Sequence, residues 1–324
     1  MMRLPWFEYR APSSVAEAAR ILAGEGANAM LIAGGTDLLP NMKRRQMAPK
    51  VLISLRKIPA LKKNGHSLGS TTTLAEIVNR KEFPLGLRQA AHQVATVHLR
   101  NMGTIGGNLC LDTRCNYYNQ NYEWRKAIDF CLKKDGDICW VATGSKRCVA
   151  MSSTDCAPAL IALGARVKLV SSTGEREIAV EDLYNNDGID YLKRRPDEIL
   201  TEVKMENSKS CYWKLRRRGA FDFPVLGVAA AQKDGNVRIA LGAVASRPFL
   251  VDKANDFLRG KKLTDEVIEE AGRIVASRAK PMDNADLDLY WRKGVAAEFT
   301  GYALRELRGD DMRETRVRIA RQDV

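Results

Sequence analysis

The sequence predicts an α+β protein with two or three domains. The chain has 324 residues, and a domain usually takes about 100–200. Helical and strand patterns alternate near the N-terminus, whereas after about residue 208 a group of strands is followed by two helices. Hydrophobic residues make up 45% of the chain, which is enough to fill sizeable cores.

Residues 1–57 are predicted to form a small unit of helix and strands. A helix is expected over 13–27, because serines can cap its start, apolar residues follow a helical period and glycines end it. Short apolar strands follow at 29–33 and 51–55, separated by a Gly-Gly-Thr-Asp turn and a basic stretch.

The same pattern continues in two further pieces. The first has a strand-like start at 67–74 and helical patterns at 75–79 and 87–94. The second has an apolar helical run at 157–165, followed by an alternating strand at 165–172.

The C-terminal part begins with strands. These are expected within 208–250, with a hairpin turn at Gly235-Asn236, and helices are expected over 264–279 and 290–307. The charged tail after Arg308 is predicted to be a solvated helix or a frayed end.

The segment from Leu111 to Ser152 carries no sustained period, and an unstructured stretch of this length is unusual in a compact domain. Six of the seven cysteines lie in this segment or at its edges: Cys110, Cys115, Cys131, Cys139, Cys148 and Cys156. Crowded cysteines in a protein that is not exported favour metal or redox chemistry. No Cys-x-x-Cys pair is present, and buried inert thiols are the alternative.

Charge and hydropathy exclude several classes. Lys and Arg total 52 against 39 Asp and Glu, a formal charge of +13. No apolar run approaches the length of a membrane span, and the start of the chain lacks a signal-peptide core, so we expect a cytoplasmic protein without membrane contact. No nucleic-acid module or basic–aromatic pattern is visible, so the charge better suits solvated surface or an acidic protein partner.

Two glycine-rich turns are candidates for ligand binding. Gly34-Gly35-Thr36-Asp37 follows a predicted strand, and Thr104-Ile105-Gly106-Gly107-Asn108 lies about 70 residues later. Glycines let a backbone approach a phosphate closely, and successive N–H groups can bind an anion. Neither turn is the dinucleotide-binding Gly-x-Gly-x-x-Gly pattern, and each alone is most often only a turn. Together they suggest one phosphate-bearing ligand.

Taken together, these motifs resemble the FAD-binding medium subunits of the xanthine oxidase (molybdenum hydroxylase) family. The resemblance covers nearly the whole chain, in the family's order: FEYRAPSSVAEAARIL at the N-terminus, LIAGGTDLLPNMK (31–43), SLGSTTTLAEI (67–77), VATVHLRNMGTIGGNLC (94–110), SSTDCAPALIALGA (152–165), KLRRRGAFDFPVLGVAA (214–230) and YWRKGVAAEFTGYALREL (290–307).

The resemblance implies a two-lobed FAD-binding domain of the vanillyl-alcohol oxidase (PCMH) type, then an α+β domain of the CO dehydrogenase flavoprotein C-terminal type. The implied lobes are 1–57 and 58–207, with the C-terminal domain at 208–324. The residues implied to bind FAD are Ala33, Gly34, Gly35, Thr36, Asp37 and Leu38 at the pyrophosphate, Thr104, Gly106, Gly107 and Asn108 in the second turn, and Asp155 and Lys214 near the flavin.

The chain departs from ordinary members by about 40 added residues, roughly 111–152. Cys110 and Cys156 lie in the shared flanks, whereas Cys115, Cys131, Cys139 and Cys148 lie inside the addition. The insert resembles that of the beta subunit in the 4-hydroxybenzoyl-CoA reductase branch, which implies that these four cysteines hold a [4Fe–4S] cluster. Such a cluster would also hold together a loop with too few apolar residues to offset its ordering entropy.

This resemblance implies an electron-transfer subunit that is not catalytically complete alone. Electrons would come from a ferredoxin-like donor through [4Fe–4S] and FAD to a [2Fe–2S] small subunit and a molybdenum large subunit, in a dimer of heterotrimers. There 4-hydroxybenzoyl-CoA would be reduced to benzoyl-CoA. Two alternatives stay open: the FAD subunit of an ordinary hydroxylase with a structural zinc loop, and a basic nucleic-acid-binding protein with a zinc loop.

Overall fold

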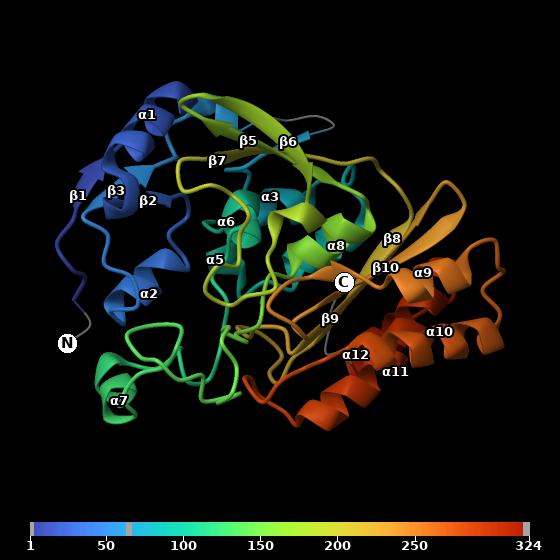
Figure 1. The fold of residues 1–324 in the computed structure, drawn as a ribbon. Coiled ribbons are helices and arrows are strands. Elements are labelled where there is room, and N and C mark those ends of the chain that lie inside the picture. Colours follow the sequence, from blue (N-terminus) through green and yellow to red (C-terminus); the bar gives the residue numbers. More distant parts are fainter. Residues whose placement is uncertain (1–2, 63–66, 320–324) are drawn as a thin grey trace.

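Three β-sheets with helices packed against them make up the part of the chain that the computed structural model describes, residues 3–62 and 67–319 (Figure 1). The sheets follow one another along the chain, from the blue N-terminal lobe through the green centre to the orange and red C-terminal part. Strands and helices are both abundant, so the predicted α+β class is confirmed.

The first sheet is parallel and small. Its strands are β1 (Glu8–Arg10), β2 (Ala29–Ile32) and β3 (Val51–Ser54), in the order β1-β3-β2. Helix α1 (Val15–Glu25) begins where the Ser14 side chain accepts a hydrogen bond from the Glu17 N–H, and it buries Ala18, Ala19 and Leu22. Strand β2 leads directly into the Gly34-Gly35 turn and helix α2 (Leu38–Lys43), so this sheet positions the first glycine-rich turn.

The second sheet is antiparallel and lies at the centre. Its strands are β4 (Ser67–Gly69), β7 (Ile199–Lys204), β5 (Arg166–Ser171) and β6 (Gly174–Ala179), in that order. The helices of this part are α3 (Leu74–Asn79), α4 (Leu85–His92), α5 (Val97–Arg100), α6 (Ile105–Leu109) and α8 (Cys156–Ala162). Every residue of α8 is buried, so this apolar helix forms the centre of the core.

The third sheet carries the C-terminal helices. Its strands are β8 (Ser210–Leu215), β9 (Leu226–Lys233), β10 (Asn236–Gly242) and β11 (Phe249–Leu250), all antiparallel. The helices are α9 (Asp252–Leu258), α10 (Asp265–Arg278), α11 (Leu289–Arg308) and α12 (Arg313–Arg318). Short 3₁₀ turns elsewhere cover Gly26–Asn28, Pro59–Leu61 and Glu181–Leu183.

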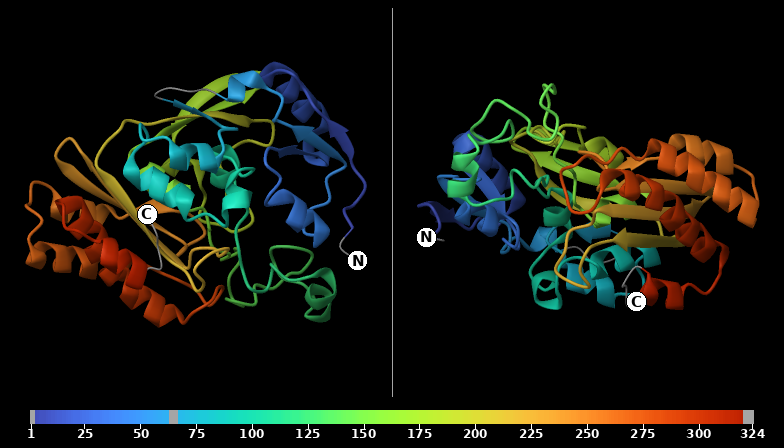
Figure 2. Two further views of the ribbon diagram at one scale, coloured as in Figure 1. Left: turned by 180° about the vertical axis from the view of Figure 1, so that it is seen from behind. Right: turned by 90° about the horizontal axis from the view of Figure 1, so that it is seen from below.

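Both faces of the third sheet are covered, as the rear view in Figure 2 shows. Side chains alternate along a strand, so Trp213 packs on the side of α11 while Tyr212 joins the core around α4 and α8. The sheet therefore connects the C-terminal helices with the central part and brings the end of β8 close to the start of α8.

The structure differs from the sequence prediction at two places in the C-terminal part. The hairpin turn residues are Asp234 and Gly235, both with positive φ, so Asn236 already belongs to the strand. The charged tail is not fully solvated, because Arg316 is buried and donates to the carbonyl oxygen of Tyr212. A long charged side chain can be buried where a carbonyl and a carboxylate accept hydrogen bonds from it. The composition of the tail does not reveal such acceptors, because they lie elsewhere in the chain.

The insert at 111–152 contains one short helix, α7 (Tyr122–Ala127), which lies below α2 in Figure 1. Buried Arg125 attaches α7 to the first lobe by donating to the carbonyl oxygen of Arg44 at 3.0 Å. The rest of the insert has only isolated bridges, as its lack of a period predicts.

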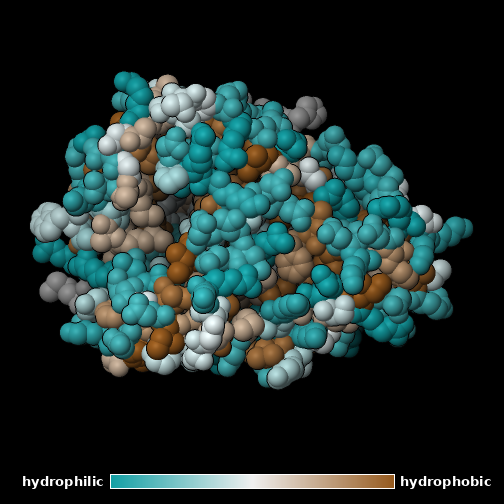
Figure 3. Space-filling model, in the orientation of Figure 1, coloured by the Kyte–Doolittle hydropathy of each residue, from teal (hydrophilic) through white to brown (hydrophobic). Residues whose placement is uncertain are grey.

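The visible face in Figure 3 is mostly hydrophilic, with scattered hydrophobic residues rather than one broad patch. Among the residues described, no helix is both long and apolar enough to span a membrane.

Candidate flavin site and cysteine pocket

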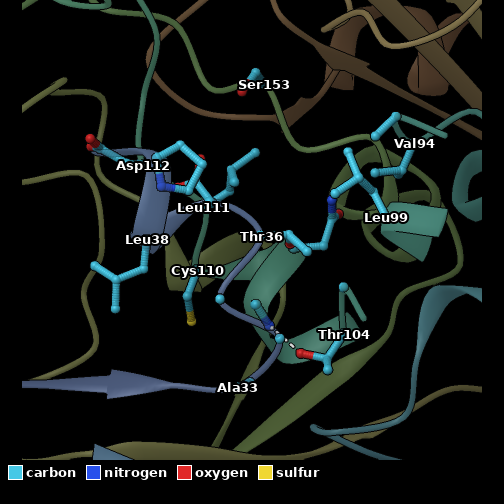
Figure 4. A pocket seen from close by; sticks show the side chains of 18 of the residues that line it. Ala33, Thr36, Leu38, Val94, Leu99, Thr104, Cys110, Leu111, Asp112 and Ser153 are labelled. Atoms are coloured by element: carbon cyan, nitrogen blue, oxygen red, sulfur yellow. Dashed lines mark hydrogen bonds between the residues drawn. The ribbon is translucent and has the colours of Figure 1, made fainter. Parts of the chain in front are cut away.

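A cavity of about 450 Å³, here called the main cavity, lies where the first lobe, the central helices and the β8–β9 loop meet. Figure 4 shows Thr36 and Leu38 entering its wall from the β2–α2 turn, with Thr104 contributed by the start of α6 and Ser153 by the segment before α8. The size is in the range of small-molecule and cofactor sites.

The β2–α2 turn presents backbone to the main cavity. A Cβ on Gly34 would lie 1.9 Å from the carbonyl oxygen of Met102, so only glycine fits this close approach. Gly35 has φ +70°, a conformation that favours glycine. In the described chain, the N–H groups from Gly34 to Asp37 donate no hydrogen bond to protein, so they are available to a bound anion.

The second glycine-rich turn is the start of α6. The Thr104 hydroxyl accepts a hydrogen bond from the Gly107 N–H at 3.1 Å, which fixes the turn (Figure 4). A Cβ on Gly106 would lie 2.8 Å from Ser70, so this glycine allows α6 to pack against the segment after β4. Asn108 accepts from the Thr154 hydroxyl and the Cys156 N–H, and so joins α6 to the start of α8.

A buried ion pair joins Asp155, at the start of α8, to Lys214 of β8. The Lys214 ammonium lies 3.0 Å from an Asp155 carboxylate oxygen, and the Tyr212 hydroxyl donates to the other oxygen at 2.8 Å. Burial raises the pKa of Asp155 and lowers the pKa of Lys214, because both charges are removed from water. Asp155 lines the main cavity, whereas Lys214 is fully buried and also donates to the carbonyl oxygens of Gln93 and Asp222.

Several polar residues of the main cavity could not be identified from the sequence. Arg114 forms an ion pair with Asp37 and stacks on the Phe223 ring at 4.4 Å, which connects the insert to the first lobe and to the β8–β9 loop. Ser153 lines the cavity, and its buried hydroxyl has no hydrogen-bond partner within the described residues. A third polar residue of the cavity wall, Asp112, belongs to the insert, as Arg114 does. Their sequence positions beside the glycine turn and Asp155 were the only available signal.

A second, much smaller pocket lies within the insert. It is lined by all four cysteines that the insert adds: Cys115, Cys131, Cys139 and Cys148. We call it the cysteine pocket. Each of these thiols is at least nine-tenths buried, and burial raises the pKa of Cys115 to about 12 and that of Cys148 to about 11.

The remaining cysteines lie elsewhere. Cys110 lines the main cavity, whereas Cys156 and Cys211 are packed in the two larger cores. Among the residues described, no three His, Cys, Asp or Glu side chains are arranged to hold a metal ion. The arrangement thus separates four cysteines from the other three without forming a closed site for a single ion.

Two family models match the chain, one after the other. The first, described as the FAD binding domain in molybdopterin dehydrogenase, matches residues 5–205. The second, the CO dehydrogenase flavoprotein C-terminal domain, matches residues 210–307. This chain belongs to the molybdopterin dehydrogenase FAD-binding family. The two-lobed FAD domain with its C-terminal α+β domain is thereby confirmed. Most of the residues that line the main cavity fall within the FAD-binding match, and the β8–β9 loop completes its wall.

Curated relatives match over most of their length. The 6-hydroxypseudooxynicotine dehydrogenase complex subunit alpha of Paenarthrobacter nicotinovorans is 34% identical, covering 91% of this chain and 92% of the relative. The aldehyde oxidoreductase FAD-binding subunit PaoB of Escherichia coli is 31% identical, covering 77% and 85%. Among solved structures, carbon monoxide dehydrogenase from Hydrogenophaga pseudoflava matches with a TM-score of 0.73 at 26% identity, over 94% of this chain and 97% of that one.

Most of the predicted FAD residues line the main cavity. The exceptions are Gly106, which packs against Ser70, and Lys214, which does not line the cavity but forms an ion pair with Asp155. The residues in the wall are Ala33, Gly34, Gly35, Thr36, Asp37, Leu38, Thr104, Gly107, Asn108 and Asp155. Their contacts with FAD stay predictions, as does a direct contact of Lys214 with the flavin.

Proposed function

We propose that this chain is the FAD subunit of a 4-hydroxybenzoyl-CoA reductase and carries a [4Fe–4S] cluster in its insert. Family membership already makes it an FAD-binding component of a molybdenum hydroxylase-type complex. The proposal adds the reductive reaction, the cluster and the direction of electron flow. These additions are supported by the resemblance of the insert and by the cysteine pocket.

One observation carries the proposal. The insert's four cysteines are separated by 15, 7 and 8 residues in the sequence, yet all four line one pocket. Tyr118 and Ala150 pack with Cys115, Cys131 and Cys148 in a small core of their own. Four convergent thiols are a complete ligand set for an iron–sulfur cluster.

The resemblance of the insert, rather than the donor set alone, favours a cluster over a zinc ion. Zinc binds its four thiolates at about 2.3 Å from one point, and the same four cysteines could also serve as its ligands. A cubane of iron and sulfide is larger than one ion, so its thiolates stand farther apart. When bound, this cluster would supply one-electron transfer, and Cys115, Cys131, Cys139 and Cys148 would hold it as thiolates.

The chain's own residues would bind and orient the flavin beside this pocket. The free N–H groups of the β2–α2 turn suit the FAD pyrophosphate, and Asp155 lies in the cavity wall with Lys214 fixing its carboxylate. FAD suits the middle of an electron-transfer chain because it exchanges one or two electrons, while the protein supplies position and electronic tuning.

The proposed assembly follows the relatives. Carbon monoxide dehydrogenase has a chain of this kind that is named its medium chain, and we propose a [2Fe–2S] small subunit, a molybdenum large subunit and a ferredoxin-like donor for this chain. A dimer of heterotrimers is the proposed state. The cysteines are free thiols, which suits the reducing cytoplasm, where we place the complex.

The test is turnover by the purified complex. We expect benzoyl-CoA from 4-hydroxybenzoyl-CoA when reduced ferredoxin is supplied, and no product from this chain alone. A complex that only oxidises a substrate and passes electrons outward, with zinc in the insert, would instead make it an ordinary hydroxylase subunit. The nucleic-acid alternative loses its basis, since the family models cover residues 5–205 and 210–307.

A further inference from the structure

The main cavity and the cysteine pocket share a wall. Cys110, Leu111, Asp112 and Arg114 line the main cavity, and the next residue, Cys115, lines the cysteine pocket. The chain therefore passes from one site to the other within a few residues, and any charge buried in this wall acts on both sites.

Lys133 places such a charge there. Its side chain is 6% exposed, and its ammonium donates to Asp112 Oδ1 at 2.8 Å, to the Thr113 hydroxyl at 2.7 Å and to the Gly188 carbonyl oxygen at 2.5 Å. These three acceptors match the three donors of an ammonium group and fix its position.

Two aromatic rings also lie close to the Lys133 ammonium, one from each of the two sites. The Tyr118 ring, in the cysteine pocket, has its centroid 4.7 Å from Lys133 Nζ, and the Tyr191 ring, in the main cavity, has its centroid at 5.4 Å. Lys133 itself lines the cysteine pocket, while its partner Asp112 lines the main cavity. The ion pair thus spans the wall, with its positive end towards the cysteines.

We propose that Lys133 is a positioning and tuning residue, whose fixed positive charge in the shared wall raises the reduction potentials of both the cluster and the FAD. A nearby cation stabilises whichever redox state carries more negative charge, and the effect is large where water is excluded. Asp112 acts in the opposite sense and holds the ammonium in place. The inference rests on the proposed function for its cluster half, whereas its flavin half requires only the FAD domain.

The experiment compares reduction potentials in the assembled complex. FAD is followed by its visible absorbance and the cluster by electron paramagnetic resonance. Lys133→Met removes the charge and leaves Asp112 unpaired, so we expect both potentials to become more negative. Lys133→Arg keeps the charge and should restore them. Asp112→Asn removes the negative partner, so both potentials should become more positive.

Lys134→Met is the matched control. It makes the same charge change one residue along the chain, but Lys134 is 40% exposed and paired with Asp135, so solvent screens it. If the Lys133→Met variant retains FAD and iron and its two reduction potentials equal those of the wild type, the proposal is overturned. If that variant does not assemble, unchanged potentials in Asp112→Asn would overturn it equally. If the wild-type complex contains no iron in this chain, the proposed function is refuted. The flavin reduction potentials of the variants would still test the effect of Lys133 on FAD.

Discussion

At the residue scale, the candidate site depends on side chains that act on the backbone or on one another. Gly34 permits the two turns to meet, because its missing Cβ leaves room for the Met102 carbonyl. Lys214 neutralises Asp155 without lining the cavity itself. Substitutions at these two positions should therefore affect FAD binding and folding in different ways.

Gly34→Ala should weaken FAD binding with little change elsewhere. A methyl group 1.9 Å from a carbonyl oxygen must push the two turns apart, and a loss of about tenfold in affinity corresponds to roughly 1.4 kcal/mol. Titration of the apoprotein with FAD, followed by flavin fluorescence, measures this. Gly144→Ala, where an added Cβ meets nothing within 4 Å, is the control, and equal affinity in both variants would refute the role of Gly34.

Lys214→Met should destabilise the fold. Removing one partner leaves the Asp155 charge buried and unpaired, which typically costs about 3–5 kcal/mol. The double variant with Asp155→Asn should recover much of this loss. Chemical denaturation of the single and double variants measures both effects, and a single variant as stable as the double would contradict the pairing.

This destabilisation should depend on pH in a defined direction. Burial already raises the pKa of Asp155, and loss of Lys214 removes an interaction that lowers it. A carboxyl whose pKa is raised in the folded state stabilises the fold at low pH and loses that contribution as pH rises. The gap between wild type and Lys214→Met should therefore narrow at acidic pH, and a gap that widens on acidification would contradict the account.

At the scale of elements, the insert is the part that we propose sets this chain apart from an ordinary FAD subunit. Its only helix in the described chain is α7, and its apolar core around Tyr118 is small. We therefore expect a cluster bound by its cysteines to contribute to its order.

Serine substitutions should separate the cysteines into two groups. Cys115→Ser, Cys131→Ser, Cys139→Ser or Cys148→Ser should lose iron and sulfide, since a serine hydroxyl replaces a thiolate ligand poorly. Cys110→Ser, at the edge of the main cavity, should retain them. Iron and sulfide are measured per bound FAD, and a Cys131→Ser variant with full iron–sulfur absorbance would break the assignment.

How far the sequence predicts the elements depends on their periodicity. Helices α1, α10 and α11 and the β9–β10 hairpin follow clear patterns, and the structure confirms them. Short elements such as α5 and α6 were missed, because four or five residues cannot show a helical period. At the site, the glycine turns were visible as motifs, whereas Arg114 and Ser153 depend on contacts between distant segments.

At the scale of the whole molecule, the insert has a small core of its own and is joined to the rest by separate polar contacts. The Arg114–Asp37 ion pair and Arg125 attach it to the first lobe, and Lys133 attaches it to the wall of the main cavity. The third sheet has its own large core beneath α10 and α11. The two regions should therefore respond differently when iron is removed.

Iron removal should loosen the insert and leave the C-terminal part intact. Binding of metal to thiolates contributes directly to the stability of a segment that has little other core. Hydrogen exchange should therefore accelerate over residues 115–148, while the strands β8–β10 keep their protection. Uniform acceleration, or none within the insert, would contradict this coupling.

The central claim is that the insert holds an iron–sulfur cluster beside FAD, and the most direct test is the cofactor content of the full chain purified without oxygen. We expect about four iron and about four acid-labile sulfide for each FAD, the composition of one [4Fe–4S] cluster. Stoichiometric zinc with no iron would contradict the claim, whatever the FAD content.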